Sequence, residues 1–192
     1  AEAPCPIVPP PKEYHDLGRT LTLETSDAAA IVVGVKATEP ERYAAEYLQT
    51  QIERRFQLQL AIYDETGVPQ AVTQILLLGQ VDTNAWLKRL CSDRKIDLSA
   101  DSPGHDGFVI RCLEDGQRQV VLIGGGNPRG VIYGQHAFFD LLRLERGRVR
   151  FPVVSVRDWP SIPWRGRPHS VLKQHLVPGA LDAYLREHIN FT

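Results

Sequence analysis

The stretch that decides the fold is "VVLIGGGNPRGVIYGQHAFFDLL", Val120 to Leu142. Its apolar start predicts a strand, its three glycines predict a tight turn, and its amphipathic remainder predicts a helix from Asn127 to about Leu144. Asn127 is a favoured N-cap residue, and Pro128 suits the first helical position, where an amide would have no helical partner. The same order of strand, glycine turn and helix cradles phosphates in nucleotide-binding proteins, so the stretch raises the question of a nucleotide site.

The glycine spacing favours an architectural turn. The dinucleotide fingerprint requires Gly-x-Gly-x-x-Gly, whereas Gly124, Gly126 and Gly130 are spaced two and four residues apart. Pro128 removes an amide donor where a phosphate would need one, and no Gly-Lys-Ser/Thr follows. We therefore expect glycines that allow a tight turn and a close approach of helix and sheet, and we expect no cofactor.

The remaining hydrophobic patterns predict a mixed α+β fold. Strands are predicted at residues 19–25, 29–37, 57–64, 72–80, 107–114, 118–125 and 148–160, and helices at residues 38–56, 82–91 and 127–144. This order mixes hairpins with helical crossovers. It favours a mixed sheet with helices mainly on one face over a doubly wound parallel sheet.

The helix predicted at residues 38–56 has the clearest local signals. Thr38 and Glu41 form a capping-box pattern, and Pro40 is tolerated in the first turn. Apolar side chains then recur at three-to-four spacing and form one stripe: Tyr43, Ala44, Tyr47, Leu48, Ile52 and Phe56. For the helix at residues 82–91 the expected cap is Asp82, and Pro152 predicts an edge or a bend in the last strand.

Composition excludes several classes of function. The chain has 192 residues, of which 43% are hydrophobic and 23% charged, as in ordinary soluble globular proteins. Its net charge of -1 and scattered basic residues argue against nucleic acid, and no apolar run reaches the ~20 residues of a membrane helix. Cys5, Cys91 and Cys112 fit no zinc or redox spacing, so they are expected to be free or buried thiols.

Two further groups of residues, the adjacent carboxylates and the histidines, are candidate sites. Adjacent carboxylates can divide acid and electrostatic roles in sugar hydrolysis, but Asp64 and Glu65 close a short strand, which favours a solvated strand end. The six histidines show no zinc-binding spacing, so no metal is expected. His136 lies among phenylalanines and is predicted to be a structural, hydrogen-bonded histidine. Arg129, in the first turn of the predicted helix, has two possible explanations: a local ion pair or a contact with a following domain.

The ends of the chain suggest its processing and domain organisation. The start "AEAPCPIVPPPKEYH" suits a mature terminus left by signal cleavage, or a chain trimmed at that point, so we expect a secreted or periplasmic protein. We predict a proline-rich tail at residues 1–17, an α/β domain at residues 18–160, and a linker with the start of a second domain at residues 161–192. The helix-like end has an apolar face, which predicts disorder, a non-native contact or dimerisation of this fragment through residues 179–192.

Several motifs together resemble the non-catalytic α/β domain that precedes the catalytic barrel in family 20 glycoside hydrolases, the β-N-acetylhexosaminidases. Similar domains occur in family 84 enzymes and in family 67 α-glucuronidases. The motifs are Gly107-Phe108, Gly124 to Gly126, Arg129-Gly130-Val131-Ile132-Tyr133-Gly134, and Asp158, Pro160, Arg165 and Gly166.

This resemblance implies an accessory domain that packs on and stabilises a (β/α)8 barrel, of which this chain would hold the first strand and helix. It implies that Arg165 opens the first barrel strand and binds the sugar, and His169, in the same strand, is a second substrate-binding candidate. The catalytic carboxylates would lie after Thr192, so the fragment itself is expected to hydrolyse nothing. The alternative is a stand-alone carbohydrate-binding module, and a nucleotide-binding protein is the third class.

Overall fold

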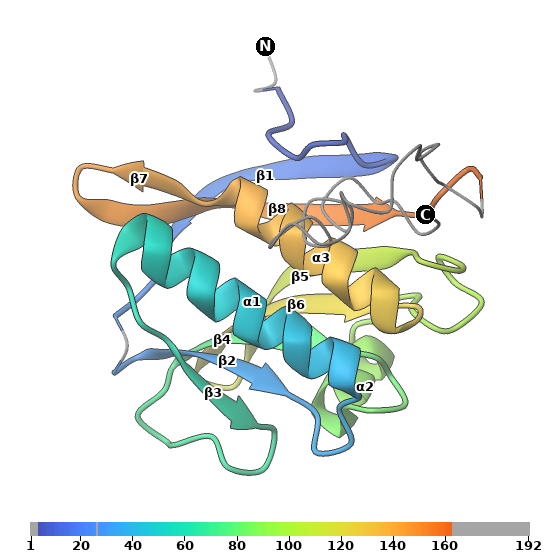
Figure 1. Ribbon diagram of the computed structural model, residues 1–192, viewed down its shortest axis with the longest axis horizontal. Coiled ribbons are helices and arrows are strands. Elements are labelled where there is room, and N and C mark those ends of the chain that lie inside the picture. The colour runs from blue at the N-terminus through green and yellow to red at the C-terminus, as the bar shows by residue number, and fades with distance from the viewer. Residues whose placement is uncertain (1–3, 26, 163–192) are drawn as a thin grey trace, which may run out of the picture.

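The computed structural model describes residues 4–25 and 27–162 (Figure 1). Within them the elements follow in the predicted order, with one short strand added: β1 (Glu13–Thr22), β2 (Ala29–Val33), α1 (Glu39–Phe56), β3 (Ala61–Asp64), β4 (Gln74–Gly79), α2 (Ala85–Asp93), β5 (Phe108–Asp115), β6 (Arg118–Gly125), α3 (Pro128–Leu141), β7 (Arg143–Glu145) and β8 (Arg148–Asp158).

The strands form one mixed sheet, as predicted. Its order is β1-β8-β5-β6-β4-β2-β3, and β7 pairs with β8 alone. The pairs β2–β3, β2–β4 and β4–β6 are parallel, whereas β1–β8, β5–β6 and β5–β8 are antiparallel. The parallel half therefore joins the antiparallel half at β6, the strand that ends in the glycine turn.

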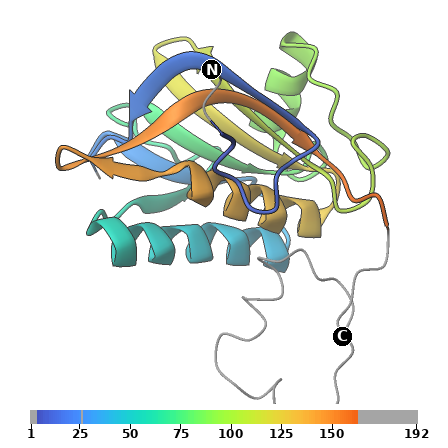
Figure 2. The ribbon, with the colours of Figure 1, turned by 90° about the horizontal axis from the view of Figure 1, so that it is seen from above.

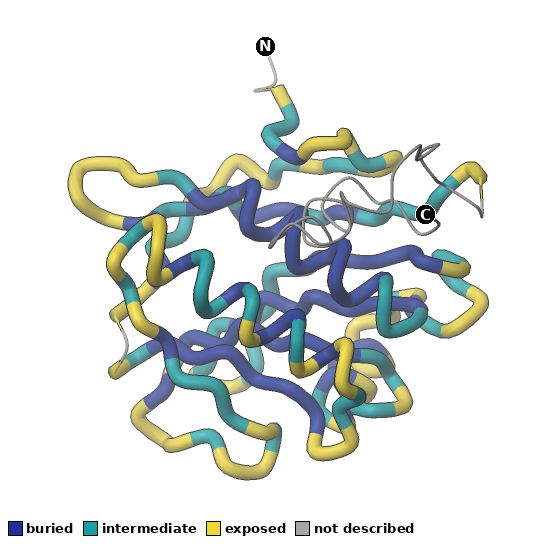
Figure 3. The backbone as a smooth tube through the Cα atoms, in the orientation of Figure 1, coloured by how far each residue is buried: buried dark blue, intermediate teal, exposed yellow. Residues whose placement is uncertain are grey.

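The helices cover the sheet unequally (Figure 2). Helices α1 and α3 lie side by side on one face, whereas α2 lies alone on the other. β4 is buried on both sides: Leu76 and Leu78 point into the core beneath α1 and α3, and Ile75 and Leu77 point into the core beneath α2. This two-sided burial explains why "QILLLG" has no polar-apolar alternation, and Figure 3 shows the buried tube running through the central strands.

Local signals set the helix starts, with one correction. The predicted cap of α3 is confirmed, because the Asn127 side chain accepts a hydrogen bond from the Gly130 amide. The predicted cap of α2 is wrong, because Asn84, and not Asp82, accepts from the Leu87 amide. Both residue types are good caps, so cap preference alone does not distinguish them.

The end of α3 also differs from the prediction. The helix stops at Leu141, and residues 143–145 pair with residues 148–150 as the hairpin β7–β8. Arg146 and Gly147 take positive φ at its turn. A hairpin contact thus overrides the helical pattern that continues to Leu144 in the sequence.

The antiparallel edge extends further than the sequence indicates. Strand β1 begins at Glu13, so residues 13–17 lie in the sheet although the proline-rich tail was predicted to include them. The tail before them packs on α3: Ile7 is buried, and the Val8 amide donates to the Asp140 carboxylate at 3.2 Å. Pro152 does not mark an edge strand. On one side it pairs with Thr20, next to a register shift in β1. On the other side it has no partner in β5, because only residues 155–158 of β8 pair with β5.

Candidate functional site

Three helix starts meet at one edge of the sheet. The parallel strands β2, β4 and β6 end there, and α1, α2 and α3 begin there behind their caps Thr38, Asn84 and Asn127 (Figure 1). Open α/β sheets bind ligands at the carboxyl ends of their strands, and helix N-termini attract anions. This edge is therefore the first place where a binding site is expected.

The glycine turn at this edge is filled by the protein's own backbone. The Gly126 amide donates to the Gly107 carbonyl at 2.9 Å, and the Gly130 amide donates to Asn127 Oδ1 at 2.8 Å. A Cβ atom on Gly125 or Gly130 would approach neighbouring backbone atoms closer than 3.0 Å. The amides that would hold a phosphate are thus occupied, and the glycines allow α3 to contact the loop before β5.

The other motif residues of α3 pack against the sheet. Tyr133 is buried, and a Cβ atom on Gly134 would lie 3.1 Å from Ile123 Cγ2. A Cβ atom on Gly124 would meet Leu98. These glycines therefore mark contacts between the elements of the domain.

Arg129 forms the local ion pair that was one of its two expected explanations. Its Nη1 lies 3.3 Å from Oδ2 of Asp106, a carboxylate with 0% side-chain exposure. The Asn127 side-chain amide donates to the same carboxylate at 3.0 Å, and His105 Nδ1 lies 3.1 Å from it. Asp106 thereby ties the loop before β5 to the start of α3. Sequence reasoning missed Asp106; its one signal is the Asp-Gly pair at the end of a polar loop.

A buried carboxylate joins the starts of α1 and α2. Glu41 is fully buried, and its Oε2 accepts from the backbone amide and the hydroxyl of Thr38, each at 2.7 Å. Its Oε1 accepts from the Gln80 amide at 3.1 Å and from the Thr83 hydroxyl at 2.5 Å. The capping box predicted from sequence is therefore only half of the role of Glu41. The other half fixes the loop between β4 and α2, in the position that a ligand takes in doubly wound proteins.

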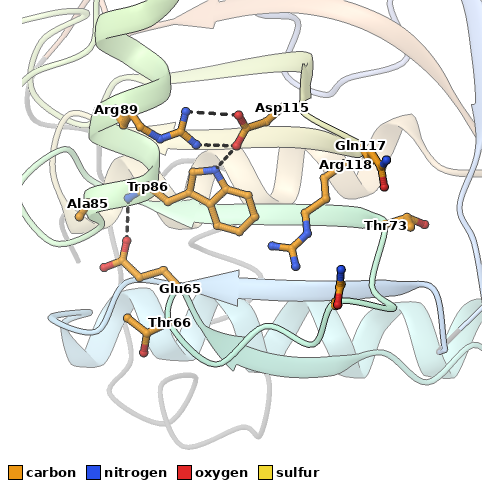
Figure 4. A pocket seen from close by; sticks show the side chains of 10 residues that line it. Glu65, Thr66, Thr73, Ala85, Trp86, Arg89, Asp115, Gln117 and Arg118 are labelled. Carbon is orange, nitrogen blue, oxygen red and sulfur yellow. Dashed lines mark hydrogen bonds and ion pairs between the residues drawn. The ribbon is translucent and has the colours of Figure 1, made fainter.

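An open polar groove lies beside α2, on the face of the sheet opposite α1 and α3 (Figure 4). Its volume is about 730 Å³, and residues of the β3–β4 loop, α2 and the β5–β6 turn line it. Trp86 lies at its centre: the indole N–H donates to Asp115 Oδ2 at 2.7 Å, and the backbone amide donates to Glu65 Oε2 at 2.6 Å. The Arg118 guanidinium lies over the ring, 5.5 Å from its centroid. We refer to it as the Trp86 groove.

An ion pair forms one wall of the Trp86 groove. Arg89 Nη2 lies 2.5 Å from Asp115 Oδ2, and Arg89 also reaches Asp93 at 3.3 Å. The hydrogen bond from Arg89 is the main cause that lowers the pKa of Asp115; the Trp86 indole acts in the same direction, and burial opposes both. The carboxylate of Asp115 is therefore held in its charged form.

This pKa shift predicts a loss of stability in acid. Because the pKa of Asp115 is lower in the folded than in the unfolded chain, its contribution is present above the unfolded pKa of about 3.9 and disappears as the pH falls through the folded pKa. Arg89 is half exposed, so we expect Asp115→Asn to cost about 1 kcal/mol at neutral pH, and less in acid.

Urea unfolding from about pH 6 to about pH 2 measures this effect. Asp93→Asn is the matched control, because Asp93 also pairs with Arg89 but is 56% exposed. A constant difference between wild type and Asp115→Asn across this range would contradict the expected linkage.

The adjacent carboxylates Asp64 and Glu65 take separate roles. Asp64 accepts from the amide and hydroxyl of Thr66, which lowers its pKa, and it is exposed as the strand-end prediction requires. Glu65 turns the other way, into the Trp86 groove, where it accepts from the second amide of α2. Nothing in its sequence position indicated this contact, which joins residues 21 positions apart.

The cysteine thiols and histidines of the described residues form no further candidate site. Cys5, Cys91 and Cys112 are free thiols, as predicted, and burial raises the pKa of Cys91 to about 11. His136 is buried and packs edge-on against Tyr47, with ring centroids 5.3 Å apart. Within residues 4–25 and 27–162, no group of three or more histidine, cysteine or acidic residues could hold a metal ion. In the same residues no helix combines the length and the apolar character needed to span a membrane.

Three predictions fall on residues beyond 162. Arg165 and His169, the candidates for substrate binding, lie outside the described residues, and so does the segment at residues 179–192, for which dimerisation was one prediction. The sequence prediction of a barrel strand and helix at residues 161–192 lies almost wholly in the same part of the chain.

Comparison with known proteins identifies the domain type. The family model described as "Glycosyl hydrolase family 20, domain 2" matches residues 4–159. This match confirms the resemblance seen in the glycine and arginine motifs. No curated protein sequence matches the chain.

Solved structures share the fold at low sequence identity. An inactive mutant of the family 20 exo-β-N-acetylglucosaminidase from Vibrio harveyi is 14% identical over 97% of this chain, with a TM-score of 0.60. The Flavobacterium johnsoniae chitobiase FjGH20 is 18% identical over 94% of this chain, with a TM-score of 0.59. The protein CpGH84B is 19% identical over 96%, with a TM-score of 0.61. This chain covers only 24%, 25% and 28% of those three proteins respectively.

Proposed function

Because the chain belongs to the family described as glycosyl hydrolase family 20, domain 2, we propose that it is the accessory N-terminal domain of a larger, secreted glycoside hydrolase. In this proposal the domain packs on a catalytic barrel of the same polypeptide and stabilises it. The whole enzyme acts on a polysaccharide or a glycoconjugate. The observation that carries the proposal is the family match, which ends at Trp159 and leaves the rest of the chain outside the domain.

The roles of the described carboxylates support a non-catalytic domain. Glycoside hydrolysis needs two carboxyl groups that flank one glycosidic bond. Asp106 and Glu41 are buried, and each is bound to several donors of its own domain. Glu65 and Asp115 lie in the Trp86 groove, but both accept hydrogen bonds from Trp86, and Asp115 also pairs with Arg89. These groups hold protein elements together, so we assign the chemistry to the part of the enzyme outside this domain.

The end of the domain is held in place, as a connection to a packed neighbour requires. The Asp158 carboxylate accepts from the Lys12 amide at 3.1 Å. The Lys12 ammonium lies 4.6 Å from the ring centroid of Trp159, and the Arg157 guanidinium lies 5.9 Å from it. Cation–π contacts of this kind restrict the ring. The chain therefore leaves the sheet at a fixed point, and we propose that residues 161–192 begin the barrel there, with Arg165 and His169 near its substrate.

We propose that the barrel packs on the face of the domain covered by α1 and α3, where aromatic rings of α1 are partly exposed. Tyr43 and Tyr47 stack with ring centroids 5.7 Å apart, and both are half-buried. Phe56 and Phe139 meet at 6.2 Å, and Arg55 lies over both rings. Aromatic side chains and arginine are enriched in the buried centres of protein interfaces. These helices also begin at the edge of the sheet near which β8 ends.

Deleting the domain tests the proposal. We expect the full-length protein to hydrolyse p-nitrophenyl N-acetyl-β-glucosaminide or an oligosaccharide, and the 192-residue chain to hydrolyse neither. We expect the full-length protein without residues 1–159 to unfold at a lower temperature, because it loses the interface with this domain. The measurements are product release and thermal unfolding by circular dichroism.

Each result bears on one part of the proposal. Hydrolysis by the 192-residue chain alone would overturn the non-catalytic role. An unchanged unfolding temperature after the deletion would overturn the stabilising role. Retention of the full-length protein inside the cell would overturn secretion.

A further inference from the structure

The Trp86 groove is unexplained by a role in packing on a barrel. It lies beside α2, on the face of the sheet opposite α1 and α3 (Figures 2 and 4). Its volume of about 730 Å³ falls within the range of small-molecule sites, about 300–1,000 Å³. From the side chains that line it, we propose that the Trp86 groove binds a pyranose unit of an oligosaccharide.

The aromatic ring at the centre of the groove is already fixed in position. Two anchors on different elements hold Trp86: Asp115 accepts from the indole N–H, and Glu65 accepts from the backbone amide. Both carboxylates are thereby occupied. Binding costs less when the contact surface is ordered in advance, because no side-chain entropy is lost. The half-buried indole is therefore held in position for a flat apolar partner, which replaces the Arg118 guanidinium over the ring.

The rim of the groove supplies polar groups without partners. No hydrogen bond joins the side chains of Gln70, Thr73 or Gln117 to the described residues, and all three are exposed. Amide and hydroxyl groups both donate and accept hydrogen bonds, as sugar hydroxyls do. A pyranose has an apolar C–H face and a polar periphery. An indole surrounded by neutral amides and a hydroxyl matches both parts.

Arg118 adds a cation that can move or bind. Within the described residues its guanidinium makes one hydrogen bond, to the Pro69 carbonyl at 3.2 Å, and no ion pair. It lies over the Trp86 ring, so a sugar that stacks on the indole displaces it to the rim. There its fork of donors can hold a uronate carboxylate or neutral hydroxyls.

The proposal is independent of the accessory-domain function, since every residue that carries it lies in the described part of the 192-residue chain. That chain is therefore the sample for the test. The probes are chitotriose, cellotriose and trigalacturonic acid, added separately to the ¹⁵N-labelled chain. The readout is the NMR signal of the Trp86 indole N–H, whose bond to Asp115 makes it sensitive to a ligand on the ring.

We expect at least one saccharide to shift this signal in a saturable manner. Trp86→Ala should then weaken binding at least about tenfold, whereas Trp159→Ala, the matched control at a tryptophan outside the groove, should leave the affinity unchanged. Arg118→Ala should weaken binding of trigalacturonic acid more than that of a neutral sugar if the ligand is acidic, and both equally if it is neutral. Gln117→Ala, at an exposed turn, provides a second variant in case Trp86→Ala does not fold.

Three outcomes would overturn the proposal. The first is that none of the three saccharides shifts the indole signal. The second is that Trp86→Ala, folded by circular dichroism, or Gln117→Ala where it does not fold, binds as the wild type does. The third is that AMP, used as a control with a flat base, shifts the signal at concentrations where the saccharides do not.

Discussion

Replacing Gly130 by alanine is expected to lower the free energy of unfolding by about 3 kcal/mol. Alanine is the better helix former by about 1 kcal/mol, so α3 on its own would gain from the change. The gain is outweighed because the new Cβ atom would lie closer than 3.0 Å to the Gly107 carbonyl oxygen. That oxygen already accepts from the Gly126 amide, so it cannot move without breaking a bond within the glycine turn.

Urea unfolding of the 192-residue chain measures this effect. Gly67→Ala is the control, because its Cβ atom would meet nothing closer than 3.5 Å, and we expect it to stay within about 0.5 kcal/mol of wild type. Gly134→Ala should fall between the two, since its Cβ atom would press on side-chain atoms at 3.1 Å and 3.3 Å. If Gly130→Ala is as stable as Gly67→Ala, the close approach of α3 to the loop before β5 is not what these glycines provide.

Removing the buried carboxylate of Glu41 should have a similarly large effect. Glu41→Ala removes the carboxylate that accepts from four donors near the starts of α1 and α2: the amides of Thr38 and Gln80, and the hydroxyls of Thr38 and Thr83. The Gln80 amide and the Thr83 hydroxyl keep a longer hydrogen bond to Thr83 Oγ1 and to the Gln80 carbonyl, whereas both Thr38 donors lose their acceptor. Unsatisfied buried donors cost about 1–3 kcal/mol each, although water that enters the cavity will satisfy some of them. We therefore expect a loss of about 3 kcal/mol in the free energy of unfolding.

Two variants separate this network from simpler effects. Glu39→Ala removes an exposed carboxylate from the same helical turn and should cost less than about 1 kcal/mol, the size of a helix-dipole effect. Glu41→Gln keeps the volume but places an amide group among donors, so its loss should lie between those of Glu39→Ala and Glu41→Ala. Equal stabilities for Glu39→Ala and Glu41→Ala would show that Glu41 acts only through the helix dipole.

These two predictions concern the same edge of the sheet. In nucleotide-binding proteins, helix starts at this edge face a ligand. In this domain the Gly107 carbonyl and the Asp106 carboxylate occupy the start of α3, and the Glu41 carboxylate occupies the space between α1 and α2. The protein's own oxygen atoms thus take up the space in front of the helix starts. The phosphate-binding layout is present in the sequence, but its donors are used for stability.

Much of the fold was predictable because its signals are local. The capping pattern at Thr38 and Glu41, the cap at Asn127 and the hairpin turn at Gly116 depend on residues only a few positions apart. The element order followed from them. The errors lay where distant contacts compete with local preference: the cap of α2, the end of α3 and the start of β1.

The candidate site was less predictable for the same reason. Trp86, Glu65, Asp115 and Arg118 lie on three separate segments of the chain. Only Glu65 drew attention in the sequence, as a neighbour of Asp64, and nothing there linked it to Trp86. The motif that attracted attention, Gly124 to Gly130, has a structural role. The spacing of residues in a motif predicts local turn geometry. A binding surface, in contrast, depends on which turns the tertiary structure brings together.

By itself the sequence determined the type and order of the elements, the glycine turn and the membership in a domain family. These depend on caps, periodicity and turn residues, whose energies come from neighbours within about four positions. Only the tertiary structure decided that β1 pairs with β8 at one edge while β2 lies near the other, that Glu41 holds the β4–α2 loop, and that side chains from three distant segments surround a groove. Strand order and buried polar pairs depend on which distant surfaces exclude water together, and no local pattern encodes that choice.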